Sequence, residues 1–176
     1  MKIQIWQEHL TPPLQSLKSV FFATTSKQQF TSEVEKESFF QHWLAYYMKH
    51  WPQELLFMMD ENEHVMAYLS GCSDSLKAID FISPKVPSYS LFQEHFSEYP
   101  AHLHINTHPN HQNRGLGGQL ITAYCQLLAE KAVPGVHIVT SPDQHNVRFY
   151  EKHGFALVEK KVWRQSYNLQ LMGKKL

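Results

Sequence analysis

Short segments in which apolar residues alternate with polar ones, or in which β-branched side chains gather, predict the strands of this chain. The expected strands are residues 2–6, 54–59, 64–71, 101–107, 136–140, 155–158 and 162–171. The second and third of them flank the polar segment Asp60-Glu61-Asn62-Glu63, and this arrangement predicts a β-hairpin.

Apolar residues at helical spacing predict two helices in the first third of the chain. Pro12 and Pro13 suit the start of the first helix. Ser32 followed by Glu35 resembles the capping box that begins a second one. The second helix carries an apolar, mostly aromatic stripe, formed by Phe40, Trp43, Leu44, Tyr47 and Trp51. Such a stripe is typical of core packing, and a substrate-binding wall is the alternative interpretation.

Residues 73–100 are the least regular part of the sequence, with several prolines and serines and one short helical patch near 91–97. A long connection inside a compact domain is often functional, so we expect an irregular insertion such as a binding loop or a lid. No second domain is needed, because a chain of 176 residues suits one domain, here residues 1–176.

Beyond the insertion, the pattern predicts a strand, a crossover helix over 116–131 and a second strand, which together form a βαβ unit. Such units are parallel and right-handed. Pro134 and Gly135 end the crossover helix, and a shorter helix over 146–153 stops at Gly154. The complete pattern predicts an α/β fold with a mixed sheet.

Charge and composition narrow the expected partners. The 16 Lys and Arg residues balance the 16 Asp and Glu residues, whereas proteins that bind nucleic acid or anionic membranes usually have a basic excess. We therefore expect no nucleic-acid and no membrane partner. No segment approaches the roughly 20 apolar residues of a membrane span or the apolar core of a signal peptide. The two cysteines, Cys72 and Cys125, suit reduced thiols, so a cytoplasmic protein is expected.

The segment QNRGLGG, from Gln112 to Gly118, joins a predicted strand to a predicted helix. Glycines at such a turn let several backbone N–H groups point at one place, and the helix dipole adds partial positive charge. The turn therefore suits a phosphate or a pyrophosphate. The Walker phosphate loop requires Lys followed by Ser or Thr, whereas Gly117 is followed by Gly118 and Gln119. The three spaced glycines of a dinucleotide-binding turn are also missing.

Two motifs together resemble a known family. The pattern Gln112-x-x-Gly115-x-Gly117 is similar to the Q/R-x-x-G-x-G/A signature of the GNAT superfamily of N-acetyltransferases. The later segment NVRFYEKHGF, from Asn146 to Phe155, resembles in slightly shortened form that family's N-x-x-A-x-x-F-Y-x-x-x-G-F region. The likeness covers about residues 101–160, which would form the donor-binding core, and the order of predicted elements agrees with it.

The resemblance implies a mixed, mostly antiparallel sheet with a central splayed pair of parallel strands, flanked by helices, and a site for acetyl-CoA. The implied pyrophosphate contacts are the backbone N–H groups of Gln112, Asn113, Arg114, Gly115, Leu116, Gly117 and Gly118. The main chain of Ile105, Asn106 and Thr107 would hold the pantetheine arm. The Asn146 amide would contact the cofactor, and Tyr150 would be the general acid for the leaving thiolate.

The implied reaction is direct transfer of an acetyl group to a primary amine in a ternary complex. A small-molecule amine is expected rather than a protein, since no docking tail is evident, and a monomer or a homodimer is expected. A tyrosine hydroxyl has a pKa near that of a thiol and could donate its proton to the thiolate. Tyr150 could instead be an aromatic residue at the edge of the core, and Asn146 could only cap its helix.

The general base is left open by the sequence. His102 and His104 lie with Asn106 on one face of the predicted strand. An imidazole with a near-neutral pKa can accept a proton directly or through water. Further candidates lie just upstream, at Glu94, Glu98 and Tyr99.

Two other functions stay open. Two histidines at alternate strand positions can share a metal ion, which would suggest a metal-dependent hydrolase. The histidines concerned are His102, His104, His108 and His111. No carboxylate pattern supports such a site, and no metal is expected. The other alternative is a degenerate module that binds acyl-CoA without turnover, although the presence of Asn146 and Tyr150 argues against it.

Overall fold

The structure, a computed structural model, describes residues 2–5, 13–144 and 146–176. Trp6 and Pro12, which the sequence assigns to the first strand and the first helix start, lie outside the described residues. The chain divides into two compact units. The first unit is Met1–Gly71 with His104–Tyr124, and the second unit is Cys72–Leu103 with Cys125–Leu176.

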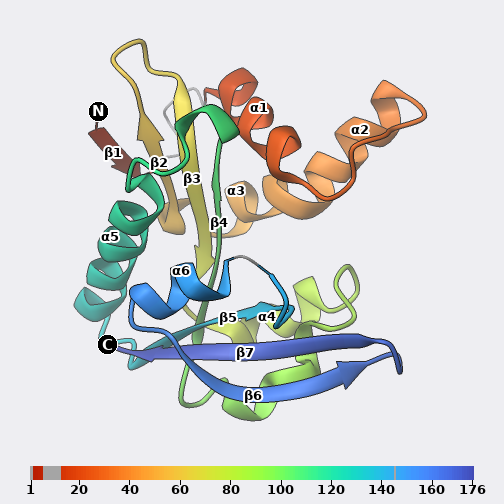
Figure 1. Cartoon of the computed structure of the whole chain (residues 1–176), viewed down its shortest axis with the longest axis vertical. Coiled ribbons are helices and arrows are strands. Elements are labelled where there is room, and N and C mark those ends of the chain that lie inside the picture. Colours follow the sequence, from red (N-terminus) through yellow and green to blue (C-terminus); the bar gives the residue numbers. More distant parts are fainter. Residues whose placement is uncertain (1, 6–12, 145) are drawn as a thin grey trace. The chain divides into compact units, whose positions relative to one another are not determined.

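Seven strands are present among the described residues, in the hydrogen-bonded order β1-β2-β3-β4-β5-β7-β6 (Figure 1). They are β1 (Lys2–Ile5), β2 (Leu55–Met59), β3 (Val65–Cys72), β4 (Ala101–Thr107), β5 (Gly135–Thr140), β6 (Ala156–Trp163) and β7 (Tyr167–Lys175). The pairs β1–β2, β2–β3, β5–β7 and β6–β7 are antiparallel, whereas β4 and β5 are parallel. The predicted hairpin and the predicted parallel pair are therefore both confirmed.

Helices complete the α/β fold predicted from the pattern. The α-helices are α1 (Leu14–Thr24), α2 (Glu33–Phe40), α3 (Tyr46–His50), α4 (Ser75–Ile82), α5 (Leu116–Glu130) and α6 (Val147–Lys152). Shorter helical segments are η1 (Gln41–Ala45), η2 (Pro52–Glu54), η3 (Tyr89–His95) and η4 (Pro109–His111). Within the described ranges, none of these helices combines the length and the apolar character that crossing a bilayer requires.

The core of the first unit joins α1 and α2 to the hairpin of β2 and β3. Its buried side chains are Leu17, Val20, Phe21, Phe40, Leu44, Leu55, Phe57, Met59, Val65 and Tyr68. The predicted capping box begins α2, because Ser32 Oγ accepts a hydrogen bond from the Glu35 N–H at 3.1 Å. The Glu35 carboxylate reaches one residue further back than expected and accepts from the Thr31 N–H at 2.6 Å.

After α2 the helix changes its form. Residues Gln41–Ala45 make a π-helical segment before α3 begins at Tyr46. A π segment is bonded from residue i to residue i+5 and is wider than an α-helix, and such segments are frequent at functional sites. The segment carries Trp43, which is 40% exposed, whereas Phe40 and Tyr47 from the same stripe are buried. The stripe therefore packs in the core at Phe40 and Tyr47 and is partly exposed to solvent at Trp43.

A buried polar contact fixes the first half of α5 in the first unit. Tyr124 Oη donates to Glu54 Oε2 at 2.9 Å, and both side chains are buried. Gly71 makes room for this contact, since a Cβ at that position would lie 2.3 Å from the Tyr124 ring. Burying a carboxylate is costly unless it is hydrogen-bonded, so the phenol stabilises Glu54 where it lies.

The second unit corrects the expectation of an irregular segment at 73–100. It contains α4, which begins where the Asp74 side chain accepts a hydrogen bond from the Lys77 N–H at 3.1 Å. It also contains the 3₁₀ segment η3, which overlaps the helical patch predicted near 91–97. The prolines and serines of this region concealed a helix that is only eight residues long.

The strands at the end of the chain are also corrected. The sequence predicts one strand over 162–171, but Val162 and Trp163 are the last residues of β6. Figure 1 shows β6 and β7 as two separate strands. The chain then reverses at Arg164 and Gln165, whose φ angles are 48° and 61°. Non-glycine residues rarely adopt this left-handed conformation. Because the turn contains no glycine or proline, the sequence pattern gave no sign that one strand ends and another begins there.

Candidate active site

The glycine-containing turn adopts the geometry of an anion site. Asn113 and Gly115 have φ angles of 60° and 75°, so the chain passes twice through the left-handed region before α5. The first intrahelical bond of α5 runs from the Gln119 N–H to the Gly115 carbonyl at 3.1 Å. The three preceding N–H groups, those of Leu116, Gly117 and Gly118, therefore have no acceptor inside the helix. Together with the helix dipole they can bind a phosphate.

Space and charge around this turn fit that ligand. A Cβ at Gly115 would meet no atom within 4 Å, so the backbone faces open space. Arg114 is exposed and makes no ion pair within the described residues. The Gln112 side chain is used locally, because its Nε2 donates to the Thr107 carbonyl at 3.3 Å. That bond ties the end of β4 to the turn.

The side chain of Asn106, on β4, makes a hydrogen bond to β3 within the first unit. Its Nδ2 donates to the Tyr68 hydroxyl oxygen at 2.8 Å. Burial raises the pKa of Tyr68 well above its usual value, so the phenol stays protonated. Ile105 and Thr107, the neighbours of Asn106 on β4, are half-buried.

A cavity of about 270 Å³ opens beside this pair in the first unit. Its walls come from α1 and the segment after it, from the α2–η1 stripe, and from β3 and β4. The lining residues are Phe21, Thr24, Thr25, Ser26, Phe39, Trp43, Tyr68, Ser70, His104 and Asn106. The polar residues His104 and Asn106 thus share one cavity, as their predicted common strand face requires.

His104 lies in the wall of this cavity, next to the Tyr47 ring at 5.7 Å between centroids. Its own surface is exposed, yet the surrounding protein atoms lower the pKa of its imidazole to about 4 through desolvation. His104 is therefore a neutral imidazole at physiological pH.

His102 has a different environment in the second unit. It is 4% exposed, and its Nδ1 lies 2.8 Å from Ser75 Oγ and 3.2 Å from Tyr89 Oη. Its ring also contacts the rings of Tyr89 and His137. These contacts describe a hydrogen-bonded histidine of the core, and they favour a structural role over the predicted role as a base.

Tyr150 lies on α6, where its ring packs against Phe149 and Phe155. It is 6% exposed, and no described residue hydrogen-bonds its hydroxyl. Burial raises the pKa of Tyr150 to about 12. The expectation that this pKa lies near that of a thiol is therefore wrong, because the apolar surroundings disfavour the phenolate.

Asn146 precedes α6 but does not cap it with its side chain. Its Oδ1 instead accepts a hydrogen bond from Thr140 Oγ1 at 3.1 Å, at the end of β5. The interpretation of Asn146 as a simple helix cap is therefore wrong. The bond holds the amide in a defined orientation and leaves its Nδ2 able to donate.

The carboxylates considered as bases are engaged in ion pairs of the second unit. Glu94 pairs with Lys161, and Glu98 pairs with Lys175 at 2.7 Å. These pairs lower the pKa of both carboxyl groups. In the described part of the chain, the metal-ligand atoms that come close together belong to Glu94, His95 and Glu159. The ammonium group of Lys161 already pairs with both carboxylates of this group. The group contains none of the four histidines of the predicted metal site.

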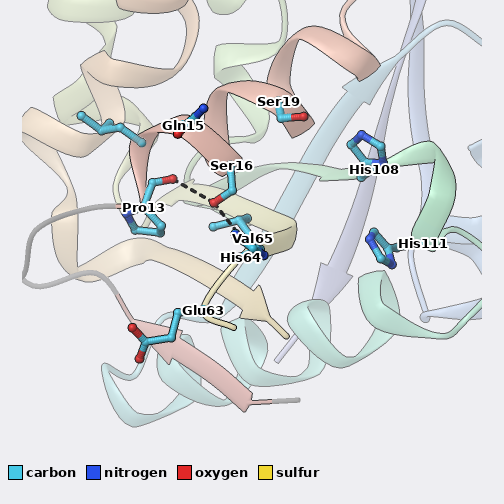
Figure 2. A pocket seen from close by; sticks show the side chains of 10 residues that line it. Pro13, Gln15, Ser16, Ser19, Glu63, His64, Val65, His108 and His111 are labelled. Carbon is cyan, nitrogen blue, oxygen red and sulfur yellow. Dashed lines mark hydrogen bonds between the residues drawn. The ribbon is translucent and has the colours of Figure 1, made fainter. Parts of the chain in front are cut away.

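His108 and His111 line a second, open cavity of about 690 Å³ in the first unit. Figure 2 shows them across the cavity from the start of α1. There Ser16 Oγ donates to the Pro13 carbonyl and accepts from the Val65 N–H, each at 3.1 Å (Figure 2). These bonds attach α1 to the hairpin, and the two histidines are not grouped with His102 or His104 as metal ligands among the described residues.

Tyr68 and Ser70 are among the lining residues of the first cavity that the sequence reasoning missed. Tyr68 and Ser70 lie on β3, whose eight residues are all buried. An uninterrupted buried strand gives no alternation from which a cavity-lining position could be read. The buried hydroxyls of Tyr68 and Ser70 were the available signal, since polar groups inside an apolar strand require partners.

Comparisons with known proteins agree with this geometry. Residues 21–155 match the acetyltransferase (GNAT) family. The chain is similar to the solved structure of SsHAT, with 18% identity over 99% of this chain and 97% of that one, and a TM-score of 0.74. It is also similar to Chaetomium thermophilum Naa20 in complex with a bisubstrate analogue, with 15% identity over 100% and 87% of the chains and a TM-score of 0.63. A third similar structure is the NatB acetyltransferase complex bound to CoA and MES, with 17% identity over 100% and 99% and a TM-score of 0.65. At such identities these structures support the fold alone.

Proposed function

Because the chain belongs to the acetyltransferase (GNAT) family, whose members use acetyl-CoA, we propose that it transfers an acetyl group directly to a primary amine of a small molecule. The observation that carries this proposal is the turn before α5. Its left-handed Asn113 and Gly115 place three N–H groups without intrahelical acceptors at the start of the helix. A pyrophosphate satisfies such groups directly.

We assign the donor contacts as follows. The backbone of Gln112–Gly118 holds the pyrophosphate, and the main chain of Ile105–Thr107 holds the pantetheine arm. The Nδ2 of Asn146 donates to the donor, since Thr140 already orients the amide. The splayed separation of β4 and β5 and a monomeric or homodimeric state also stay predictions. The two cysteines are free thiols, which supports a reducing compartment such as the cytoplasm.

In the proposed reaction the amine nitrogen forms a bond to the acetyl carbon, and the bond from that carbon to sulfur breaks. The amine must lose one proton, and the sulfur leaves as a thiolate. His104 is the proposed acceptor of the proton, directly or through water, because its lowered pKa keeps the imidazole neutral. His104 is a weak base. It can accept the proton after the nitrogen has bonded to the acetyl carbon, because the nitrogen is then positively charged and strongly acidic.

Tyr150 is proposed to stabilise the leaving thiolate. Its pKa of about 12 lies above the roughly 8.5 of a free thiol. Complete transfer of the phenol proton is therefore unfavourable, whereas a hydrogen bond from the hydroxyl to the sulfur is favourable. We therefore propose that Tyr150 donates a hydrogen bond to the sulfur and does not transfer its proton completely.

The proposal is tested in two steps. Thermal unfolding is first measured with and without saturating acetyl-CoA, which should stabilise the folded chain by about 2.7 kcal/mol at 100 times its Kd. Gly115→Ala should weaken this effect, because alanine disfavours the left-handed φ that shapes the turn. Gly154→Ala is the matched control, since Gly154 also has a positive φ, of 83°, but follows α6.

Thiol release with a panel of amines is the second step. Release that depends on both acetyl-CoA and an amine supports an enzyme. Stabilisation by acetyl-CoA without release from any amine would instead indicate a module that binds acyl-CoA without turnover. No stabilisation at all would contradict the proposed site.

A further inference from the structure

The lining and the volume of the 270 Å³ cavity in the first unit favour one chemical class of acceptor. We propose that it binds the acceptor and selects a small amine that carries a flat aromatic ring and no second cationic group. This inference rests on the proposed acetyl transfer, and it assigns the acceptor class that the transfer alone leaves open.

The walls of the cavity are rich in aromatic rings. Phe21 and Phe39 lie 5.7 Å apart between centroids, and Phe39 and Trp43 lie 6.2 Å apart. Tyr68 adds a fourth ring. Aromatic rings prefer tilted or edge-to-face contacts at such distances, so an aromatic ring between these walls gains energy beyond the burial of its area.

Charge is absent from the lining. None of the ten lining residues is Asp, Glu, Lys or Arg. Lys27 approaches the Phe39 ring at 6.0 Å, but it is paired with Glu35 at 2.5 Å and lies outside the lining. A diamine or polyamine keeps a second ammonium group, and burying it without a carboxylate is costly. The cavity therefore favours an acceptor whose single amine reacts as the neutral form.

One end of the cavity is polar. The Tyr68 hydroxyl accepts from Asn106 Nδ2 at 2.8 Å, so its own proton can be donated to a ligand. Tyr68 is 2% exposed, and a buried donor of this kind requires a partner. His104 lies in the same lining and can accept a proton from the amine. The aromatic walls and the polar end thus suit the two ends of one small molecule.

Size supports the same class. Sites for drug-sized ligands begin at about 300 Å³, and this cavity of about 270 Å³ is slightly smaller. A single ring with a short amine-bearing chain fits this volume. A peptide could insert only its terminal residue, so a peptide amine is an outcome that the test must separate.

The experiment measures thiol release from saturating acetyl-CoA with four acceptors. They are phenethylamine, hexylamine, 1,4-diaminobutane and a peptide with a free amino terminus. We expect kcat/KM for phenethylamine to exceed that for hexylamine about tenfold, since an aromatic contact of about 1.4 kcal/mol corresponds to that factor. The diamine and the peptide should be poorer still.

Two substitutions connect this selectivity to the cavity. Trp43→Ala should raise KM for phenethylamine about tenfold and raise KM for hexylamine clearly less, because the alkyl chain loses only buried area whereas the ring also loses an aromatic contact. Trp43 is 40% exposed, so its removal should not unfold the chain, and Trp43→Phe should restore most of the selectivity. Trp163→Ala, on β6, is the matched control, because Trp163 does not line the cavity.

Ser26→Asp places a carboxylate at an exposed position of the lining and should raise kcat/KM for 1,4-diaminobutane about threefold, the effect expected of an exposed ion pair. Ser166→Asp, in the exposed turn between β6 and β7, is its control.

Equal rates for all amines, or a preference for the diamine or the peptide, would overturn the inference while acetyl transfer stands. Equal effects of Trp43→Ala and Trp163→Ala would overturn it too. A chain that releases no thiol with any amine contradicts the proposed function and this inference together.

Discussion

Two histidines of strand β4, His102 and His104, lie in opposite environments. His102 is 4% exposed and hydrogen-bonded by Ser75 and Tyr89 in the second unit. His104, two residues later, is exposed in the aromatic cavity of the first unit. Alternate spacing assigns both residues to one face of a regular strand. The difference teaches that a strand face can change from core to cavity within two residues, so spacing alone does not define a site.

The largest effect is expected when the exposed histidine is removed. His104→Ala should lower kcat/KM about 100-fold, because a positioned base contributes at least that factor to proton transfer. The acetyl-CoA-dependent stabilisation should be unchanged, since His104 is not assigned to the donor. Steady-state thiol release and thermal unfolding measure the two quantities. A loss smaller than threefold would show that water alone accepts the proton.

The buried histidine should affect stability instead. His102→Ala removes the partner of the buried Ser75 hydroxyl and leaves a cavity. We expect unfolding to become easier by about 2 kcal/mol, or roughly a 30-fold change in the unfolding equilibrium. Chemical denaturation measures it, and activity per folded molecule should stay within about twofold. A large loss of activity with unchanged stability would reverse the roles of the two histidines.

Tyr150→Phe adds a third environment to the comparison, since the Tyr150 side chain is 6% exposed and no described residue hydrogen-bonds its hydroxyl. Removing one hydrogen bond to the leaving sulfur should lower kcat about tenfold, which corresponds to about 1.4 kcal/mol. Stability should hardly change, because no described partner is left unpaired. Single-turnover thiol release measures the effect. Equal loss of turnover and acetyl-CoA binding would leave Tyr150 with a packing role only.

The smallest effect concerns pH. The imidazole of His104 accepts a proton only when neutral, and its pKa is lowered to about 4, so activity should fall only as the pH falls through about 4. Values of kcat/KM calculated for the neutral amine should therefore be flat from about pH 5.5 to about pH 8. A decline centred near the usual histidine pKa of about 6.5 would show that another histidine, or a more solvated His104, controls the reaction.

Local sequence signals predicted the secondary structure around the turn before α5 well. The turn before α5 depends on glycine at a positive φ and on the unpaired N–H groups of a helix start, and both are properties of a short segment. The hairpin and α5 were predicted within a few residues for the same reason. The errors lie where the signal was weak or misleading. Eight residues of α4 lay among prolines and serines, and two non-glycine residues made the turn between β6 and β7.

The sequence by itself determined the α/β fold, the glycine-containing turn before a helix and the resemblance to the acetyltransferase family, because these follow from local periodicity and from motifs of fixed spacing. Only the tertiary structure decided which histidine is buried, that Asn106 bonds Tyr68, and that burial raises the pKa of Tyr150 to about 12. These properties depend on residues that are distant in the chain, since burial and pKa are set by the surrounding atoms. The same holds for the uncharged aromatic cavity, whose walls come from four separate segments.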